Sequence, residues 1–416
     1  MTGAGACCYS REARRRLRVL MISDVYFPRV NGVSTSIQTF RTALEARGID
    51  TVLVAPEYPG SGNDNEADIC RLPSRPVPLD PEDRLMKWGP LANLDRRLAS
   101  ADFDLVHIQT PFAAHYAGQR FARARGIPCL TTYHTHFEEY LFHYIRFLPR
   151  SLLRAAARTL ARHQCNALNA VVVPSAEMAD TLRQYDVTAP MHIVPTGLPE
   201  SQFEKGDRAA FRLQHGITPT QPVILYVGRV AYEKNIDFLL EATARIAPRH
   251  PDLMLVIAGE GPAQHELVQQ TKRLGITAHV KFVGYLERAT TLRDCYAAGD
   301  LFVFASQTET QGLVLLEALA SGLPVLAIPA LGAASIINPQ RGAVAAEATP
   351  EGFGEQLAAL LDSPETLSHM SGEAIRFARE WDADSQATKL AALYHELVTA
   401  PMAVDLSHPA TVAGDV

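Results

Sequence analysis

Two carboxylates, Glu309 and Glu317, flank a glycine in the segment T-E-T-Q-G-L-V-L-L-E-A-L. A carboxylate accepts hydrogen bonds from hydroxyl groups, and Gly312 between them would let a ligand approach the backbone closely. Two such acceptors beside a phosphate site suit a sugar nucleotide, which carries hydroxyls on both sides of its diphosphate. The competing interpretation is a solvated loop charge at Glu309 and a helix-surface residue at Glu317.

The same segment predicts the start of a helix, because apolar residues recur at helical spacing after it. Thr308 or Thr310 is the expected N-cap. Backbone N–H groups of Gln311, Gly312 and Leu313 would then point out of the helix N-terminus, which attracts anions. This tip is therefore a candidate anion site.

A second cluster follows a predicted strand at 222–227, in the segment G-R-V-A-Y-E-K-N. Arg229 and Lys234 stand there, before a helix expected over 236–246. A guanidinium fork and a compact ammonium at the carboxyl end of a strand can neutralise a diphosphate. The alternative is a pair of unrelated surface cations.

These motifs resemble those of the retaining glycosyltransferases of family four, over about residues 18–397. The shared patterns are E-x7-E, from Glu309 to Glu317, and G-R-x-x-x-x-K-N, which contains Arg229 and Lys234. The resemblance implies the GT-B fold. It also implies that Glu309 contacts the donor sugar, that Glu317 holds the ribose hydroxyls, and that the two cations stabilise the leaving diphosphate.

Further residues of the candidate site lie in loops after other predicted strands. Gly259 ends a strand expected over 253–259 and lets the backbone pass close to a nucleotide. The resemblance implies that Gly32 lies against the donor phosphates, that Tyr285 and Leu286 border the base, and that His134 bonds the transferred sugar. His136 is the second choice for that histidine. The H-x-H pair could also indicate a metal, although no third ligand has suitable spacing.

Alternating strands and helices must position these groups. Short apolar runs predict buried parallel strands at 18–23, 51–55, 104–108, 127–132 and 170–174, and again at 222–227, 253–259, 280–286, 301–305 and 325–328. Ser34 or Thr35 is the expected cap of the first helix and Ser175 that of a later one. The pattern predicts an α/β protein with two doubly wound domains, whose ligands lie at the carboxyl ends of the strands.

The expected organisation is two Rossmann-like domains facing across a cleft. A tail at 1–16, expected to be disordered, precedes an acceptor-side domain at 17–200 and a nucleotide-sugar domain at 201–380. A helix at 381–400, which includes Trp381, Leu390, Leu393 and Tyr394 on one helical period, crosses back to the first domain. Residues 401–416 are a second tail expected to be disordered.

A basic stripe marks the stretch after residue 142. Arginines recur every fourth residue at Arg150, Arg154, Arg158 and Arg162, beside an apolar side that includes leucines. Such a helix could bind an anionic membrane surface, although a solvated face of a core helix also explains it. Lipid-using members of the family resemble this pattern.

Composition limits the function classes. With 416 residues, 47% hydrophobic residues and a formal net charge of −6, the chain reads as globular and is not expected to bind nucleic acid. The six cysteines show no C-x-x-C spacing, and no signal peptide or membrane span is expected. These features predict a cytoplasmic protein, peripheral on the inner face of the cell membrane.

The sequence thus predicts a metal-independent, retaining hexosyltransferase without a cofactor. UDP-glucose is the expected donor and a lipid such as diacylglycerol the expected acceptor. The alternatives are a GDP-mannose-dependent enzyme acting on a glycolipid or phosphoinositide, a transferase with a soluble acceptor, a sugar-nucleotide epimerase, and a non-catalytic sugar-nucleotide sensor.

Overall fold

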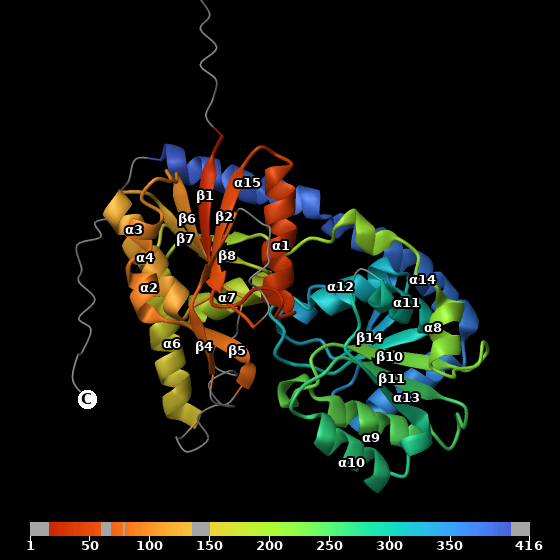
Figure 1. Cartoon of the computed structure of the whole chain (residues 1–416). Coiled ribbons are helices and arrows are strands. Elements are labelled where there is room, and N and C mark those ends of the chain that lie inside the picture. The colour runs from red at the N-terminus through yellow and green to blue at the C-terminus, as the bar shows by residue number, and fades with distance from the viewer. Residues whose placement is uncertain (1–15, 60–67, 78–79, 135–149, 289, 401–416) are drawn as a thin grey trace, which may run out of the picture.

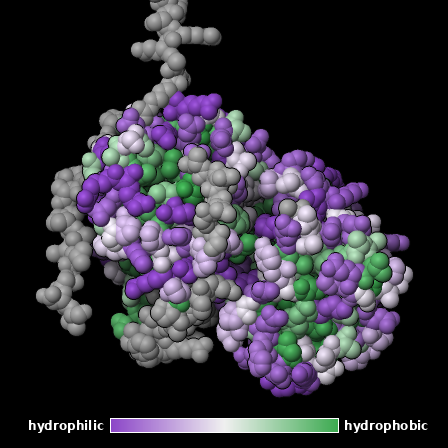
Figure 2. All heavy atoms as spheres, in the orientation of Figure 1, coloured by the Kyte–Doolittle hydropathy of each residue, from purple (hydrophilic) through white to green (hydrophobic). Residues whose placement is uncertain are grey.

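The computed structural model describes residues 16–59, 68–77, 80–134, 150–288 and 290–400. The tails predicted at 1–16 and 401–416 therefore lie, apart from residue 16, outside these ranges. The chain forms two halves, each built on its own sheet (Figure 1). Hydrophilic residues are spread over the visible face of both halves (Figure 2).

The sheet of the first half has seven described strands in the order β3-β2-β1-β6-β7-β8-β9. All neighbours in it are parallel. Its strands are β1 Arg18–Ile22, β2 Asp50–Pro56, β3 Ile69–Leu72, β6 Leu105–Ile108, β7 Cys129–Thr132, β8 Ala170–Val173 and β9 Met191–Ile193. A separate antiparallel hairpin pairs β4 Ser74–Val77 with β5 Asp80–Met86.

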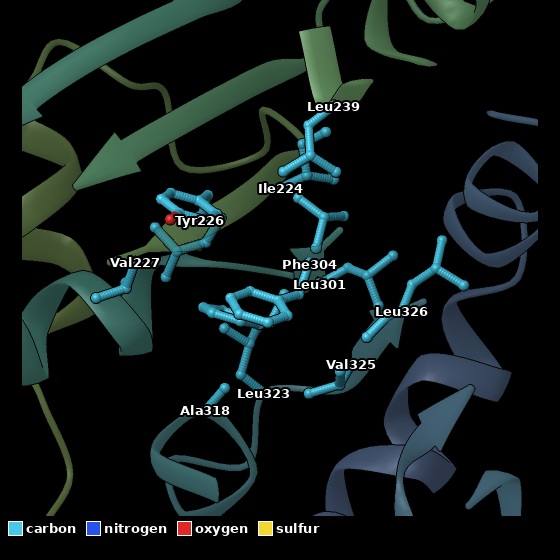
Figure 3. Packing of buried hydrophobic residues seen from close by; sticks show 14 of the residues in the cluster. Ile224, Tyr226, Val227, Leu239, Leu301, Phe304, Ala318, Leu323, Val325 and Leu326 are labelled. Carbon is cyan, nitrogen blue, oxygen red and sulfur yellow. The ribbon is translucent and has the colours of Figure 1, made fainter. Parts of the chain in front are cut away.

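The second sheet is also parallel, with six described strands in the order β12-β11-β10-β13-β14-β15. They are β10 Val223–Val227, β11 Met254–Ala258, β12 Val280–Gly284, β13 Leu301–Phe304, β14 Val325–Ala327 and β15 Ala343–Ala345. Side chains of its central strands pack against one another and against flanking helices, as Figure 3 shows for Ile224, Phe304 and Ala318. Being covered on both faces, these strands are continuous apolar runs.

Helices cover the two sheets. Those of the first half are α1 Gly32–Glu45, α2 Trp88–Ala92, α3 Leu94–Arg97, α4 Ala113–Arg125, α6 Arg150–Asn166 and α7 Ala176–Gln184. Those of the second are α8 Arg208–Gln214, α9 Ile236–Ile246, α10 Gln264–Arg273, α11 Thr291–Ala298, α12 Leu313–Ala320, α13 Pro350–Leu361 and α14 Pro364–Ala378. The predicted α/β class with two doubly wound halves is confirmed.

The structure confirms one of the three predicted helix caps. Ser175 accepts a hydrogen bond from the Met178 N–H and caps α7, as predicted. The predicted cap of α1 was wrong, because Asn31 rather than Ser34 or Thr35 accepts from the first turn. The cap of α12 was wrong too, because that helix begins after Gly312 with no side-chain cap.

The last helix, α15 Ala383–Thr399, lies across the first half (Figure 1). Leu390, Leu393 and Tyr394 are buried in a core of the first half, next to side chains of α1. Trp381 was wrongly placed on this helical period: it ends a preceding 3₁₀ turn and packs edge-on against Phe377 of the second half. The helix thus crosses back to the first half as expected, and it begins two residues after its predicted start.

The two connections between the halves run beside each other. Leu198 donates its N–H to the Trp381 carbonyl at 2.7 Å, and Ala383 donates to the Leu198 carbonyl at 2.9 Å. Gly197 lies so close to this crossing that an added Cβ would come within 2.4 Å of the Ala383 Cα. Glycine is therefore required where the outgoing and returning segments meet.

Candidate functional site

A cavity of about 550 Å³ lies between the two halves, at the carboxyl ends of the second sheet's strands. The first half contributes the loop after β1, including Arg29, Asn31 and Gly32, together with Tyr58. The second half contributes loops after β10, β11 and β12, and the start of α12. Ligands of doubly wound sheets bind at this edge, so the position agrees with the sequence-based expectation.

The loop after β10 is built by special backbone conformations. Gly228 has a φ of 155°, and Asn235 adopts the left-handed region with a φ of 55°. The Asn235 side-chain amide donates to the Ala305 carbonyl at 3.2 Å, which ties the loop to the end of β13. A Cβ on Gly259 would lie 1.9 Å from the Gly228 carbonyl oxygen. Glycine at 259 therefore lets the loops after β10 and β11 meet.

The two predicted cations lie on this loop, each beside a carboxylate. Lys234 Nζ is 2.6 Å from Glu309 Oε1, and Arg229 Nη1 is 3.9 Å from Glu233 Oε1. Burial alone would lower the pKa of Lys234, but Glu309 and Glu233 hold it above the ordinary value of 10.5. Lys234 is therefore charged at neutral pH, as binding of a diphosphate requires.

The second carboxylate, Glu317, is deeply buried with its side chain 2% exposed. One oxygen forms an ion pair with Arg288, and the other accepts a hydrogen bond from the Tyr296 hydroxyl at 2.9 Å. The Glu317 carboxylate raises the pKa of Arg288, and burial with Glu317 raises that of Tyr296 well above 10. The Glu317 carboxylate is thus held by two donors, of which Arg288 also lines the cavity.

Sequence reasoning missed both Arg288 and Tyr296. They precede Glu317 by 29 and 21 residues, so no local motif links them to it. One signal was available: a glutamate between leucine and alanine on a buried helix needs a partner, because an unpaired buried charge is costly. That rule predicts that a partner exists but not which residue supplies it.

The cavity brings together most of the predicted site residues. Its lining includes Gly32, Arg229, Lys234, Gly259, Tyr285, Leu286, Glu309, Leu313 and Glu317. Their roles stay predictions. His134, Gln311 and Gly312 are not among the lining residues. Gln311 is 7% exposed, and its side chain binds the backbone of Thr196 instead of facing the cavity.

His134 lies at the end of the described segment that follows β7. Its Nε2 is 3.1 Å from the Gln109 side-chain oxygen, and its carbonyl accepts a hydrogen bond from the Thr310 hydroxyl at 2.9 Å. Burial lowers the pKa of His134 to about 4, so the imidazole is neutral at pH 7. His136, the second choice, lies outside the described residues.

The basic stripe lies on α6, where Leu153, Ala157 and Ala161 form the buried face. Arg154, Arg158 and Arg162 are on the exposed side, and Leu152 next to them is 55% exposed. Arg158 lies over the Tyr185 ring, and Arg162 is 3.7 Å from Asp186. The Arg150 side chain lies outside the described part of the structure. The exposed face thus combines cations with an apolar residue.

The described residues also bear on metal binding and on membrane insertion. Among these residues, no group of three or more His, Cys, Asp or Glu side chains could hold a metal ion. In the same part of the chain, no helix is long and apolar enough to span a bilayer.

Comparison with known proteins adds independent findings. Residues 30–202 match the family described as Glycosyltransferase Family 4, and residues 207–377 match Glycosyl transferases group 1. The chain is 33% identical over 317 residues to the alpha-monoglucosyldiacylglycerol synthase of Streptococcus pneumoniae, covering 75% of this chain and 71% of that protein. It is 28% identical to a GDP-mannose-dependent alpha-mannosyltransferase of Mycobacterium tuberculosis, covering 87% and 90%.

Solved structures agree in fold. The crystal structure of Anabaena HepE in complex with UDP-glucose has a TM-score of 0.75 at 17% identity, covering 92% of this chain and all of that one. Sucrose-phosphate synthase from Thermosynechococcus elongatus also reaches 0.75, at 19% identity, covering 92% of this chain and 99% of that one.

Proposed function

Because the chain belongs to family 4 of the glycosyltransferases and has the GT-B fold, we propose that it transfers glucose from UDP-glucose to diacylglycerol or a similar membrane lipid, with retention of the anomeric configuration. The observation that carries this proposal is the cavity wall with Arg229 and Lys234 on one loop and Glu309 and Glu317 around the start of α12. It offers cations for a diphosphate and acceptors for hydroxyls on both sides.

The two cations would stabilise the departing diphosphate. Arg229 offers a planar fork and Lys234 a compact charge, and both lie at the same strand end. The positive end of α12, which begins after Gly312, would add to their field. Positive charge aimed at the developing negative charge lowers the barrier to bond cleavage.

The remaining groups would hold the sugar and the ribose. Glu309 would accept hydrogen bonds from sugar hydroxyls, and Glu317 from the ribose. His134, neutral at pH 7, would bond the transferred sugar from the first half. No protein side chain is proposed as a covalent nucleophile. An oxygen of the leaving phosphate would instead take the acceptor proton on the same face of the sugar.

We propose that the reaction needs no divalent metal, because two cations already oppose the diphosphate. The test is transfer in the presence of EDTA at a concentration that removes Mg²⁺ and Mn²⁺. Unchanged rates are expected. Loss of transfer that added Mg²⁺ restores would contradict this part of the proposal.

A lipid acceptor is supported by the relatives and by α6. The Streptococcus pneumoniae protein is named for a diacylglycerol product, and the chain covers 71% of it. On α6, Arg154 and Arg158 are exposed beside Leu152. Cations beside an apolar side chain suit the surface of an anionic membrane, each charge contributing about 1 kcal/mol. We propose that the protein works peripherally at the inner face of the cell membrane.

A second candidate is a GDP-mannose-dependent mannosyltransferase acting on a glycolipid or phosphoinositide. It is favoured by the Mycobacterium tuberculosis relative, which aligns over more of this chain than the synthase does. Within the cavity, Tyr285 and Leu286 border the expected base position. Neither side chain carries a charge that would distinguish uracil from guanine. The donor must therefore be measured.

The deciding experiment is a donor screen that measures nucleotide release with and without lipid acceptors in anionic vesicles. We expect release from UDP-glucose to depend on diacylglycerol, with an α-linked product. Release from GDP-mannose alone would favour the second candidate, and release with a polysaccharide or small-molecule acceptor would favour a soluble one. A new sugar formed from UDP-GlcNAc without acceptor would indicate an epimerase, and binding without any turnover a sensor.

A further inference from the structure

Three consecutive residues connect the cavity to the first half of the chain. Glu309 lines the cavity, and the next two residues, Thr310 and Gln311, form hydrogen bonds to the other half. Their partners are far away in sequence, at separations of 176 residues for His134 and 115 residues for Thr196. The loop that carries Glu309 is therefore fixed from the opposite domain.

Thr310 is bonded on both its side chain and its backbone. Its hydroxyl donates to the His134 carbonyl at 2.9 Å, and its own carbonyl accepts from the Ser175 hydroxyl at 3.1 Å. His134 and Glu309 are the two residues expected to contact the transferred sugar from opposite halves. Thr310, which follows Glu309 in the chain, thus links the backbone of the Glu309 loop to the backbone of His134.

Gln311 forms a reciprocal pair with the backbone of Thr196. The Thr196 N–H donates to the Gln311 side-chain oxygen at 2.9 Å, and the Gln311 amide donates to the Thr196 carbonyl at 2.7 Å. The Thr196 hydroxyl in turn donates to Ser36 on α1 at 2.7 Å. All three side chains are at most 7% exposed. Buried polar groups of this kind lose most when one partner is removed.

The loop that carries Glu309 is also held by contacts within the second half. The Gly332 N–H donates to the Glu309 carbonyl at 3.0 Å. A Cβ on Gly332 would lie 1.9 Å from the Thr310 carbonyl oxygen, so the two loops pack backbone to backbone. The loop of Glu309 has little freedom to move independently of Thr310 and Gln311.

We propose that Thr310 and Gln311 are positioning residues that form an interdomain latch. The latch is defined as the hydrogen bonds of Thr310 to His134 and Ser175 and of Gln311 to Thr196. It sets Glu309 and His134 against the same sugar only when the halves meet, and so limits water, a competing acceptor, at the reacting carbon. The role in sugar transfer rests on the proposed function, whereas the coupling between the halves does not.

The first test is independent of turnover. Exchange of the Thr196 amide hydrogen with solvent reports its bond to Gln311 and is measured by hydrogen–deuterium exchange in the full chain, with and without UDP. We expect UDP, bound in the cavity between the halves, to slow this exchange in the wild type. Gln311→Met, which keeps the length but not the amide, should exchange faster and lose the response to UDP. An unchanged rate and response in Gln311→Met would overturn the latch.

The second test uses isosteric variants of Thr310. Thr310→Val removes the hydroxyl, Thr310→Ser keeps it, and Thr308→Val is a control in the same loop. We expect Thr310→Val and Gln311→Met to reduce transfer about tenfold and to raise the share of donor lost to water. The dissociation constant for UDP should stay within about twofold, and Thr310→Ser and Thr308→Val should match the wild type.

The outcomes separate the two proposals. If the wild type transfers no sugar to any acceptor, the proposed function fails, and the Thr196 exchange still decides the coupling. If Thr310→Ser loses as much transfer as Thr310→Val, or if transfer and UDP binding fall together with the melting temperature, the latch is wrong.

Discussion

At the scale of single residues, cationic and carboxylate side chains of the cavity pair with one another. Lys234 is bonded to Glu309, Arg229 lies near Glu233, and Glu317 is bonded to Arg288. A diphosphate must therefore compete with carboxylates for the cations that would hold it. Removing one of these carboxylates can therefore strengthen the binding of UDP while it weakens turnover of the substrate.

Glu309→Gln should show that opposition. Without the carboxylate, Lys234 is available to the diphosphate, so UDP should bind severalfold more tightly. Turnover should fall by about 100-fold or more, because a neutral amide accepts weaker hydrogen bonds from the sugar hydroxyls than a carboxylate and also offers them a donor group. Calorimetry with UDP and initial rates of transfer measure the two effects. Glu260→Gln, a second carboxylate of the cavity, controls for the general loss of negative charge. Weaker UDP binding in Glu309→Gln would contradict the competition.

Arg288→Gln tests whether Glu317 recognises the ribose. The substitution removes the charge that holds the Glu317 carboxylate, so the preference for UDP over 2′-deoxy-UDP should shrink about tenfold, and stability should fall by about 1–3 kcal/mol. Arg288→Lys is the matched control that keeps the charge. Competition binding of the two nucleotides measures the preference, and a preference equal to that of the wild type would remove Glu317 and Arg288 from ribose binding.

At the scale of elements, α6 combines a structural face and an exposed one. Leu153, Ala157 and Ala161 bury one side, and the arginines lie on the other side, where Arg158 also packs over the Tyr185 ring. Periodicity alone could not separate a membrane-facing side from a solvated one, because both are exposed and charged. The burial pattern identifies the exposed face, and only a binding measurement identifies what it contacts.

The double variant Arg154→Glu/Arg158→Glu should lower the partition onto anionic vesicles by at least about tenfold, because each cation near such a surface contributes about 1 kcal/mol. Lys272→Glu/Arg273→Glu, on the exposed side of α10, makes the same change of charge elsewhere and should have little effect. Sedimentation with vesicles at low and physiological salt measures the partition. Equal losses in the two variants would argue against a specific role for α6.

At the scale of the whole molecule, one buried histidine, His107, connects the crossing helix to the first sheet. His107 Nδ1 is 2.6 Å from the Tyr394 hydroxyl on α15, and its Nε2 is 2.7 Å from the Thr132 hydroxyl on β7. Burial, with a smaller effect of His134, lowers the pKa of His107 to about 3. The folded chain therefore keeps this imidazole neutral at a pH where the unfolded chain would protonate it.

The free energy of unfolding should therefore fall as the pH drops from about 6.5 towards 3, by up to about 1.4 kcal/mol per pH unit for His107 alone. His115 and His134, each lowered to about 4, act in the same direction, whereas the pKa of Asp24, raised by burial to about 6, acts in the opposite one. Urea unfolding at several pH values measures the slope. His107→Gln should flatten it, the exposed His395→Gln should not, and an unchanged slope in His107→Gln would refute the assignment.

Much of this protein followed from short-range patterns. Apolar runs located ten of the thirteen described strands of the two sheets and missed β3, β9 and β15. The helix expected over 236–246 has those bounds in the structure. Glu309, Glu317, Arg229 and Lys234 could be selected because each pair lies within one loop and helix at the end of one strand. In parallel α/β sheets such ends meet at one edge, so local spacing is enough to predict a shared cavity.

Only the tertiary structure decided which partners these residues meet. Arg288 and Tyr296 hold Glu317 from other elements of the chain. The side chain of Gln311, a residue predicted to offer its backbone N–H to an anion, binds Thr196 in the other half. The physical reason is that buried polar groups must be paired, while the chain leaves open which distant atom pairs them. Spacing along the sequence selects the groups that carry charge, and packing between elements selects their partners.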